Sequence, residues 1–126
     1  MAAGVDLCSV SDLDVLILDH EPISGQATAR LLLPLRVEVV HSMAEAKKLL
    51  DSCEPRALVC DYFLQRGETT GELLAFVREK WPAVRLVIYS AYRDPAVTTV
   101  LATGLAHALV TKPAGRDELL AAIQGL

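Results

Sequence analysis

Leu58-Val59-Cys60-Asp61-Tyr62-Phe63-Leu64 is the stretch that decides the fold of this 126-residue chain. An apolar run that ends on an aspartate is typical of a strand buried on both faces, as in parallel sheets. An acid placed where such a strand leaves the sheet lies at the carboxyl edge, where open α/β sheets build their binding sites. Alternatively, Asp61 caps the next helix. That helix is predicted to begin only near Thr70, which is too far along for a cap.

The composition indicates a packed, acidic domain. Hydrophobic residues make up 52% of the chain, and the net charge is −4. There is no run of Lys and Arg, so we expect no direct binding to nucleic acid. No apolar run approaches the roughly 20 residues of a membrane span, and the N-terminus lacks the basic start and apolar core of a signal peptide. We expect a flexible tail over residues 1–12 and no membrane partner.

The three cysteines, Cys8, Cys53 and Cys60, are odd in number and lack metal-ligand spacing. We interpret them as reduced, mostly buried thiols, which indicates the cytoplasm.

Strand-like and helix-like stretches alternate along the rest of the chain. Strands are expected at 13–19, 36–41, 56–61, 84–90 and 107–112, and an amphipathic helix follows each of them. Such alternation with short connections predicts parallel pairing with right-handed crossovers. The expected fold class is α/β, a three-layer α/β/α sandwich of flavodoxin-like (βα)5 type whose five-stranded parallel sheet has the order 2-1-3-4-5.

Local signals place the helix boundaries and faces. Pro22 suits the first turn of the first helix, whose buried stripe is predicted to be Ile23, Ala27 and Leu31. Residues 42–45 form a capping box, and Asp94 followed by proline is a strong helix start. Further core-facing apolar positions are predicted on the later helices: Met43, Ala46, Leu49, Leu50, Leu73, Phe76, Val77, Trp81, Val97, Val100, Leu101, Leu119, Leu120 and Ile123.

The residues at the strand ends form a set with shared chemistry. The first strand delivers Asp19, His20 and Glu21, the third Asp61, the fourth Ser90 and the fifth Lys112, whereas the second delivers only His41. In this fold the first, third, fourth and fifth strands surround the point where the strand order reverses, so their terminal residues converge. A carboxylate can act as a nucleophile toward a phosphoryl group, a cation held by neighbouring acids can neutralise charge, and lysine and serine can bind phosphoryl oxygens.

These residues and their order make the chain similar to the receiver domain of two-component response regulators. The matching segments are Leu16-Ile17-Leu18-Asp19-His20-Glu21-Pro22, Val59-Cys60-Asp61, Val87-Ile88-Tyr89-Ser90-Ala91 and Lys112-Pro113. The resemblance extends from Leu13 to the last helix and implies a receiver domain over 13–126. In such receiver domains the corresponding Lys-Pro peptide is commonly cis, so the resemblance implies a cis Lys112-Pro113 peptide.

The resemblance assigns a role to each residue at the strand ends. It implies that Asp61 accepts a phosphoryl group from a phosphohistidine of a sensor kinase or phosphotransfer protein. Asp19, Asp61 and the backbone carbonyl of Phe63 are expected to hold Mg2+. Lys112 is expected to pair with the phosphoryl group, and Ser90 to hydrogen-bond to it and report its presence.

The chain departs from the family pattern at the second acid of the first strand end, where it has His20. Imidazole is a poor ligand for Mg2+, which prefers hard oxygens, so Glu21 is a candidate substitute and Mn2+ an alternative ion. Cation affinity is expected to be weak, and phosphorylation slow or lost.

Three further departures concern switching and the loop after the acceptor. Leu109 replaces an aromatic residue that usually swings inward when the serine engages phosphate, and Tyr92 is a candidate substitute. Gln65 replaces a common proline. The bulk of Phe63 could slow water attack on an acyl phosphate.

We therefore interpret the chain as a phospho-accepting receiver, a signalling module that is not an enzyme. Phosphorylation is expected to switch a protein-interaction surface near the fourth helix, fifth strand and fifth helix. The chain is expected to act through a downstream output protein or domain and is a candidate homodimer. Its last residues follow the fifth helix directly, so we expect no output domain within this sequence. The alternative is a pseudo-receiver that binds proteins without phosphorylation. A flavodoxin-type cofactor binder would need a phosphate loop after the first strand, and a dehalogenase-like phosphatase an Asp-x-Asp pair there.

Overall fold

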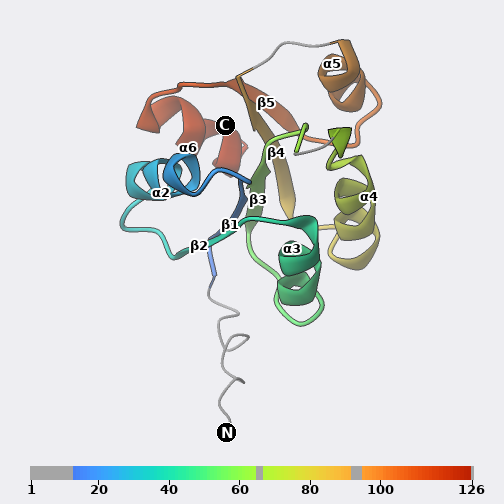
Figure 1. Ribbon diagram of the computed structural model, residues 1–126, viewed down its shortest axis with the longest axis horizontal. Coiled ribbons are helices and arrows are strands. Elements are labelled where there is room, and N and C mark those ends of the chain that lie inside the picture. Colours follow the sequence, from blue (N-terminus) through green and yellow to red (C-terminus); the bar gives the residue numbers. More distant parts are fainter. Residues whose placement is uncertain (1–12, 65–66, 92–94, 126) are drawn as a thin grey trace, which may run out of the picture.

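The computed structural model describes residues 13–64, 67–91 and 95–125, which form a single parallel sheet covered by helices on both faces (Figure 1). The elements in chain order are β1 (Val15–Leu18), α2 (Pro22–Leu31), β2 (Val37–Val40), α3 (Met43–Leu50), β3 (Ala57–Cys60), α4 (Gly71–Lys80), β4 (Arg85–Ser90), α5 (Pro95–Ala102), β5 (Ala108–Thr111) and α6 (Arg116–Gln124). The strand order is β2-β1-β3-β4-β5, with every neighbouring pair parallel. The predicted fold class and strand order are confirmed.

The central strands are buried on both faces because each supplies side chains to two separate cores. Leu16 and Leu18 of β1 belong to the core beneath α3, α4 and α5, whereas Val15 and Ile17 belong to the core beneath α2 and α6. Figure 1 shows these two groups of helices on opposite sides of the sheet. The continuous apolar runs in the sequence therefore reflect a middle layer that no water reaches.

The predicted buried stripe of α2 is wrong. Ile23 is 87% exposed and Ala27 is also exposed, whereas Gly25 and Thr28 are buried. A Cβ atom added at Gly25 would lie 2.8 Å from Cγ1 of Val39, so the helix approaches the sheet closely on its small-residue face. Close packing on small residues thus turns the larger apolar side chains of the first turns outward.

Other helix expectations have mixed outcomes. Ser42 caps α3, since its Oγ accepts the amide of Glu45 at 3.1 Å, as the capping box predicts. The Glu45 carboxylate accepts the amide of His41, at 2.8 Å, one residue before the cap. On α5, Val97 and Val100 are buried as predicted, but Leu101 is 37% exposed.

His107 extends the pairing of β4 and β5 by one residue. Its amide donates to the carbonyl of Leu86 at 2.8 Å, and its Nδ1 accepts the amide of Leu86 at 2.9 Å. The imidazole thus takes the place of a backbone acceptor at this end of the sheet.

Some expectations lie outside the described residues: the tail over 1–12 with Cys8, Gln65, Tyr92 and the helix start at Asp94. Within the described residues, Cys53 and Cys60 are buried, and the Lys112-Pro113 peptide is cis. None of the helices in the described part of the chain has both the length and the apolar character needed to cross a membrane.

Candidate functional site

Three strands bring two aspartates and a lysine together at the carboxyl edge of the sheet. Asp19 follows β1, Asp61 follows β3 and Lys112 follows β5. The Nζ of Lys112 lies 3.0 Å from Oδ2 of Asp19 and 3.0 Å from Oδ2 of Asp61. The side chains of Asp19, Asp61 and Lys112 are 4%, 14% and 18% exposed, so the ammonium bridges two acids that are largely screened from water.

The two aspartates differ in their electrostatic surroundings. Burial raises the pKa of Asp61, and the neighbouring Lys112 only partly offsets this effect. Burial also raises the pKa of Asp19. Hydrogen bonds with Ser24, the Glu21 amide and Lys112 outweigh it, and the net shift is downward. For Lys112, burial lowers the pKa, but the charge of Asp61 and hydrogen bonds to both acids raise it on balance. Lys112 therefore stays charged, and Asp19 keeps its negative charge to lower pH than Asp61 does.

A small hollow of about 220 Å³ opens over this cluster. Its lining is His20, Glu21, Ser24, Asp61, Phe63, Ser90, Ala91 and Lys112. Every strand-end residue that the sequence singled out is in this lining except Asp19 and His41. Ser90 is only 1% exposed at the end of β4, and its carbonyl accepts the amide of Lys112 at 2.8 Å. The hollow thus presents a carboxylate, a hydroxyl and an ammonium to anything that enters it.

The sequence interpretation missed Ser24. The Nζ of Lys112 donates to Oγ of Ser24 at 3.2 Å, so this hydroxyl helps to hold the lysine. Ser24 lies in the first turn of α2, just after Pro22. The available signal was the proline, which marks a helix start directly after a strand end and therefore places the first turn of α2 near the carboxyl edge of the sheet.

Thr70 was also missed as a supporting residue. Its hydroxyl is fully buried and donates to the carbonyl of Asp61 at 2.9 Å, while its amide donates to the carbonyl of Tyr62 at 2.9 Å. Phe63 pairs with Thr69 across the same loop. These bonds hold the backbone at the exit of β3, which carries Asp61.

His41 supports the site from outside the hollow. Its Nδ1 lies 3.0 Å from the backbone carbonyl of Asp19, so β2 contributes a contact to the end of β1 without adding a group to the lining. The sequence placed His41 apart from the converging residues, and the structure agrees with that placement.

His20, Asp19 and Asp61 each offer a ligand atom, and these atoms lie within 4.8 Å of one another. Two carboxylates and an imidazole are a donor set that fits a divalent cation. Within the described residues, Nδ1 of His20 is buried and has no hydrogen-bond partner. The Glu21 carboxylate lines the same hollow, as does Phe63, whose carbonyl the resemblance implies as a ligand.

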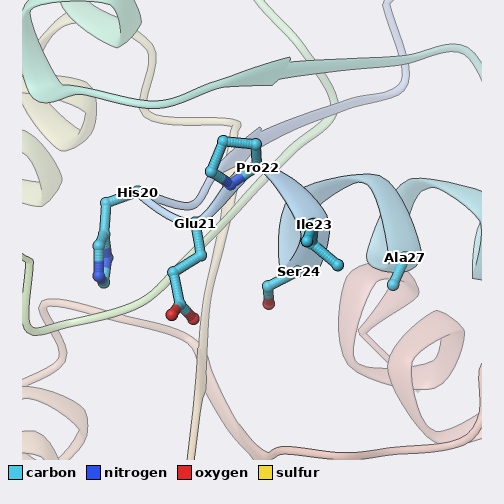
Figure 2. Close-up of a pocket in the computed structure, with 6 residues that line it drawn as sticks. All are labelled: His20, Glu21, Pro22, Ile23, Ser24 and Ala27. Atoms are coloured by element: carbon cyan, nitrogen blue, oxygen red, sulfur yellow. The ribbon is translucent and has the colours of Figure 1, made fainter.

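A larger and more open hollow of about 680 Å³ adjoins the small one. Figure 2 shows its six lining residues, with His20, Glu21 and Ser24 pointing to the same side of the turn between β1 and α2. The lining is His20, Glu21, Pro22, Ile23, Ser24 and Ala27. Three of these residues line both hollows, so the exposed apolar face of α2 leads directly to the acidic cluster.

Comparison with known proteins finds the same fold. No protein-family model matches the sequence. Over 81 residues the chain is 37% identical to the hydrogenase transcriptional regulatory protein HoxA of Cupriavidus necator, a match that covers 64% of this chain and 17% of that relative. A CheY-like response regulator receiver domain protein of Methanospirillum hungatei is 19% identical, with a TM-score of 0.80 and coverage of 89% of this chain and 90% of that one.

Two further neighbours were solved with ligands at their own sites. The response regulator TrrA of Thermotoga maritima, in complex with Mg2+ and BeF, is 20% identical with a TM-score of 0.76, covering 89% of this chain and 96% of that one. A response regulator of Burkholderia pseudomallei with a phosphorylated aspartic acid, calcium ion and citrate is 24% identical with a TM-score of 0.81, covering 90% of this chain and 67% of that one. The chain therefore has the fold of response regulator receiver domains, and the resemblance read from the sequence is confirmed.

Proposed function

We propose that this chain is a phospho-accepting receiver domain of a two-component phosphorelay, with Asp61 as the acceptor. The observation that carries the proposal is the convergence of Asp19, Asp61 and Lys112 at the carboxyl edge of a receiver fold. In this proposal the chain is a signalling module that assists its own phosphorylation. It acts in the cytoplasm on a downstream output protein or domain.

The chemical step is a transfer from nitrogen to oxygen. A carboxylate oxygen of Asp61 attacks phosphorus, the phosphorus–nitrogen bond of a phosphohistidine breaks, and the released imidazole keeps the bond's electron pair and takes up a proton. The Lys112 ammonium, held by Ser24, neutralises charge on the phosphoryl oxygens, and the Ser90 hydroxyl donates to one of them.

The acidic cluster suits a divalent cation. In the proposal Asp19, Asp61 and the carbonyl of Phe63 hold Mg2+, with Glu21 or His20 completing the set and Mn2+ as an alternative ion. When bound, the cation supplies charge neutralisation between the acceptor carboxylate and the phosphoryl oxygens. That TrrA was solved with Mg2+ at its own site supports this assignment.

The open hollow beside α2 is the proposed docking site of the phosphodonor protein. Ile23 and Ala27 expose apolar surface there, and the hollow shares His20, Glu21 and Ser24 with the acidic cluster. A donor protein that covers this surface would bring its phosphohistidine to Asp61 while shielding the reaction from water.

The test is phosphorylation by a small-molecule donor. Purified chain is mixed with acetyl phosphate and Mg2+, and its intact mass is measured, with Asp61→Asn as the control. We expect a phosphoryl adduct on the wild-type chain that the control lacks. The proposal would be contradicted if no adduct formed in the presence of Mg2+ and none formed in the presence of Mn2+.

A pseudo-receiver is the second candidate, and one observation favours it. Because Lys112 already bridges Asp19 and Asp61, the cluster is neutralised in part without any cation, and His20 replaces an oxygen ligand. Such a chain would bind partners through the same surfaces, perform no phosphoryl transfer and give no adduct in the acetyl phosphate experiment.

A further inference from the structure

We propose that the imidazole of His20 is a direct ligand of the cation at this site, so that the site selects a borderline first-row cation such as Co2+ or Zn2+ over Mg2+. The inference deepens the proposed function and rests on its site. It requires only that the site binds a cation, and it can fail while phosphoryl transfer to Asp61 succeeds.

The placement of His20 carries the first step. A ring nitrogen of His20 and one carboxylate oxygen each from Asp19 and Asp61 lie within 4.8 Å of one another. The two acids come from the ends of adjacent strands, and His20 directly follows Asp19. His20 and Asp61 line the small hollow, and an oxygen of Asp19 lies within 4.8 Å of a ligand atom of each. A single ion could reach all three donors with little rearrangement.

The hydrogen bonding of the His20 ring is the second observation. Its Nδ1 is buried and, among the described residues, has no hydrogen-bond partner. A buried polar nitrogen without a hydrogen-bond partner costs free energy, so such atoms usually serve a ligand or a function. A cation bound by the ring would fix its tautomer and orientation, which no described residue does through Nδ1.

The neighbouring histidine offers a contrast. Nδ1 of His41 already lies 3.0 Å from the carbonyl of Asp19, and His41 does not line the hollow. His41 thus acts behind Asp19, where a contact to a ligand residue can orient it. Only His20 presents a ring nitrogen to the two carboxylates among the described residues.

Ligand chemistry then decides the class of cation. Mg2+ prefers oxygen donors in near-octahedral geometry, whereas imidazole suits the later first-row cations. Replacing one carboxylate of the usual acid pair by an imidazole also removes a negative charge, which weakens Mg2+ most because its binding depends chiefly on charge. The selectivity should therefore shift from Mg2+ toward Co2+ and Zn2+.

The test compares cation binding by the full chain and two variants. Co2+ is titrated by its visible absorption, and Mg2+ affinity is measured by competition, for the wild type, His20→Asp and His20→Asn. We expect the ratio of Co2+ to Mg2+ affinity to fall by about tenfold or more in His20→Asp, which restores an acid pair. His20→Asn, which offers an oxygen of similar reach without charge, should also lose selectivity.

A second readout detects the ligand itself. In the Co2+-loaded chain, the proton NMR spectrum should contain a hyperfine-shifted imidazole N–H signal that is lost in His20→Asn and retained in His41→Gln. Circular dichroism confirms that each variant is folded. An unchanged affinity ratio, Co2+ binding without that signal, or no Co2+ binding at millimolar concentration would each overturn the inference. An Asp61 adduct formed with Mg2+ in such a case would leave the proposed function intact.

Discussion

At the scale of single residues, Lys112 is the group that makes this cluster of acids compatible with folding. Two largely buried carboxylates would repel each other, and the ammonium lies 3.0 Å from an oxygen of each. Its Nζ also lies over the ring of Tyr89, 5.3 Å from the ring centroid. Lys112 thus serves the folded state as well as the proposed chemistry.

Lys112→Met should therefore destabilise the protein. We expect a loss of about 1–3 kcal/mol in the free energy of unfolding at pH 7, because both carboxylates lose their shared partner. Without the lysine, the folded-state pKa of Asp61 rises further above its unfolded value. A raised carboxyl pKa favours the folded state at low pH, so the deficit should shrink as the pH falls from 7 through the raised pKa of Asp61 toward its ordinary 3.8.

Urea unfolding at pH 4, 5 and 7 measures this effect. Lys47→Met is the matched control, since Lys47 forms an exposed ion pair with Glu72 at 3.1 Å and should cost little. An equal deficit at all three pH values would show that the two acids do not depend on Lys112.

His107 gives the stability of the protein a second pH dependence. It lies at the opposite end of the strands from the acidic cluster. Burial, followed by the charges of Arg85 and Arg78, lowers the pKa of His107 below its ordinary 6.5. The unfolded chain then takes up the proton at higher pH than the folded chain. Stability is therefore full above pH 6.5 and falls as the pH drops through 6.5 toward the lowered folded value.

His107→Asn should flatten this pH dependence, because the asparagine oxygen can still accept the Leu86 amide but does not titrate. The measurement is the free energy of unfolding between pH 7.5 and 5 for both proteins. Parallel curves would mean that His107 does not contribute to the acid sensitivity of the fold.

At the scale of elements, α2 is the helix whose structure departs most from its sequence pattern. It packs against the sheet through Gly25 and Thr28, which leaves Ile23 exposed beside the acidic cluster. An exposed large apolar residue at the rim of a hollow is typical of a protein-binding surface. Because α2 packs closely on the sheet through its small residues, its larger apolar side chains lie on the opposite face, which is the proposed docking surface.

Ile23→Asp should lower the rate of phosphoryl transfer from the cognate donor protein by about tenfold or more, as expected when an apolar anchor is replaced by a charge. Phosphorylation by acetyl phosphate should be unchanged, because that donor needs no docking surface. Helix stability should be kept, since an acid suits the first turn.

The matched control is Leu33→Asp. Leu33 is another exposed aliphatic side chain, 62% exposed, and it lies beyond the C-terminal end of α2. Equal effects of both variants on transfer, or an equal loss with acetyl phosphate, would rule out a specific docking role for Ile23.

At the scale of the whole molecule, the sheet connects the site to a distant surface. The cluster gathers residues from β1, β3 and β5, and β5 also packs against α5 and α6. Leu109 of β5 is half-buried against the core that includes Val97 and Val100 of α5. In the proposed function, a change at Lys112 or Ser90 would reach the α5–β5–α6 surface through these packed side chains, with Leu109 at the position where the resemblance implies an aromatic ring.

Phosphorylation should change hydrogen exchange over α5 and β5, residues 95–111, and leave β2 and α3, residues 37–50, unchanged. The physical reason is that β5 begins the path from Lys112, whereas β2 lies at the opposite edge of the sheet. Exchange is measured by mass spectrometry with and without acetyl phosphate, and Asp61→Asn serves as the control. Changes confined to peptides that contain Asp61 and Ser90 would argue against a switched surface.

Most of the architecture could be predicted from the sequence because it depends on local signals. Continuous apolar strands, such as the run before Asp61, alternate with helices and leave few topologies open. Because the carboxyl ends of parallel strands meet at one edge, the sequence also predicts that Asp19, Asp61, Ser90 and Lys112 lie together. These features repeat along the chain, and each is decided within a few residues.

Only the tertiary structure decided which faces and partners are used. The outward turn of Ile23 depends on how closely Gly25 approaches Val39, and the hydroxyl that holds Lys112 comes from Ser24, 88 positions away in sequence. The buried Nδ1 of His20 likewise shows only when neighbouring strands and loops surround it. Periodicity records which residues are apolar, whereas distances across the fold depend on the shapes of side chains that are remote in sequence.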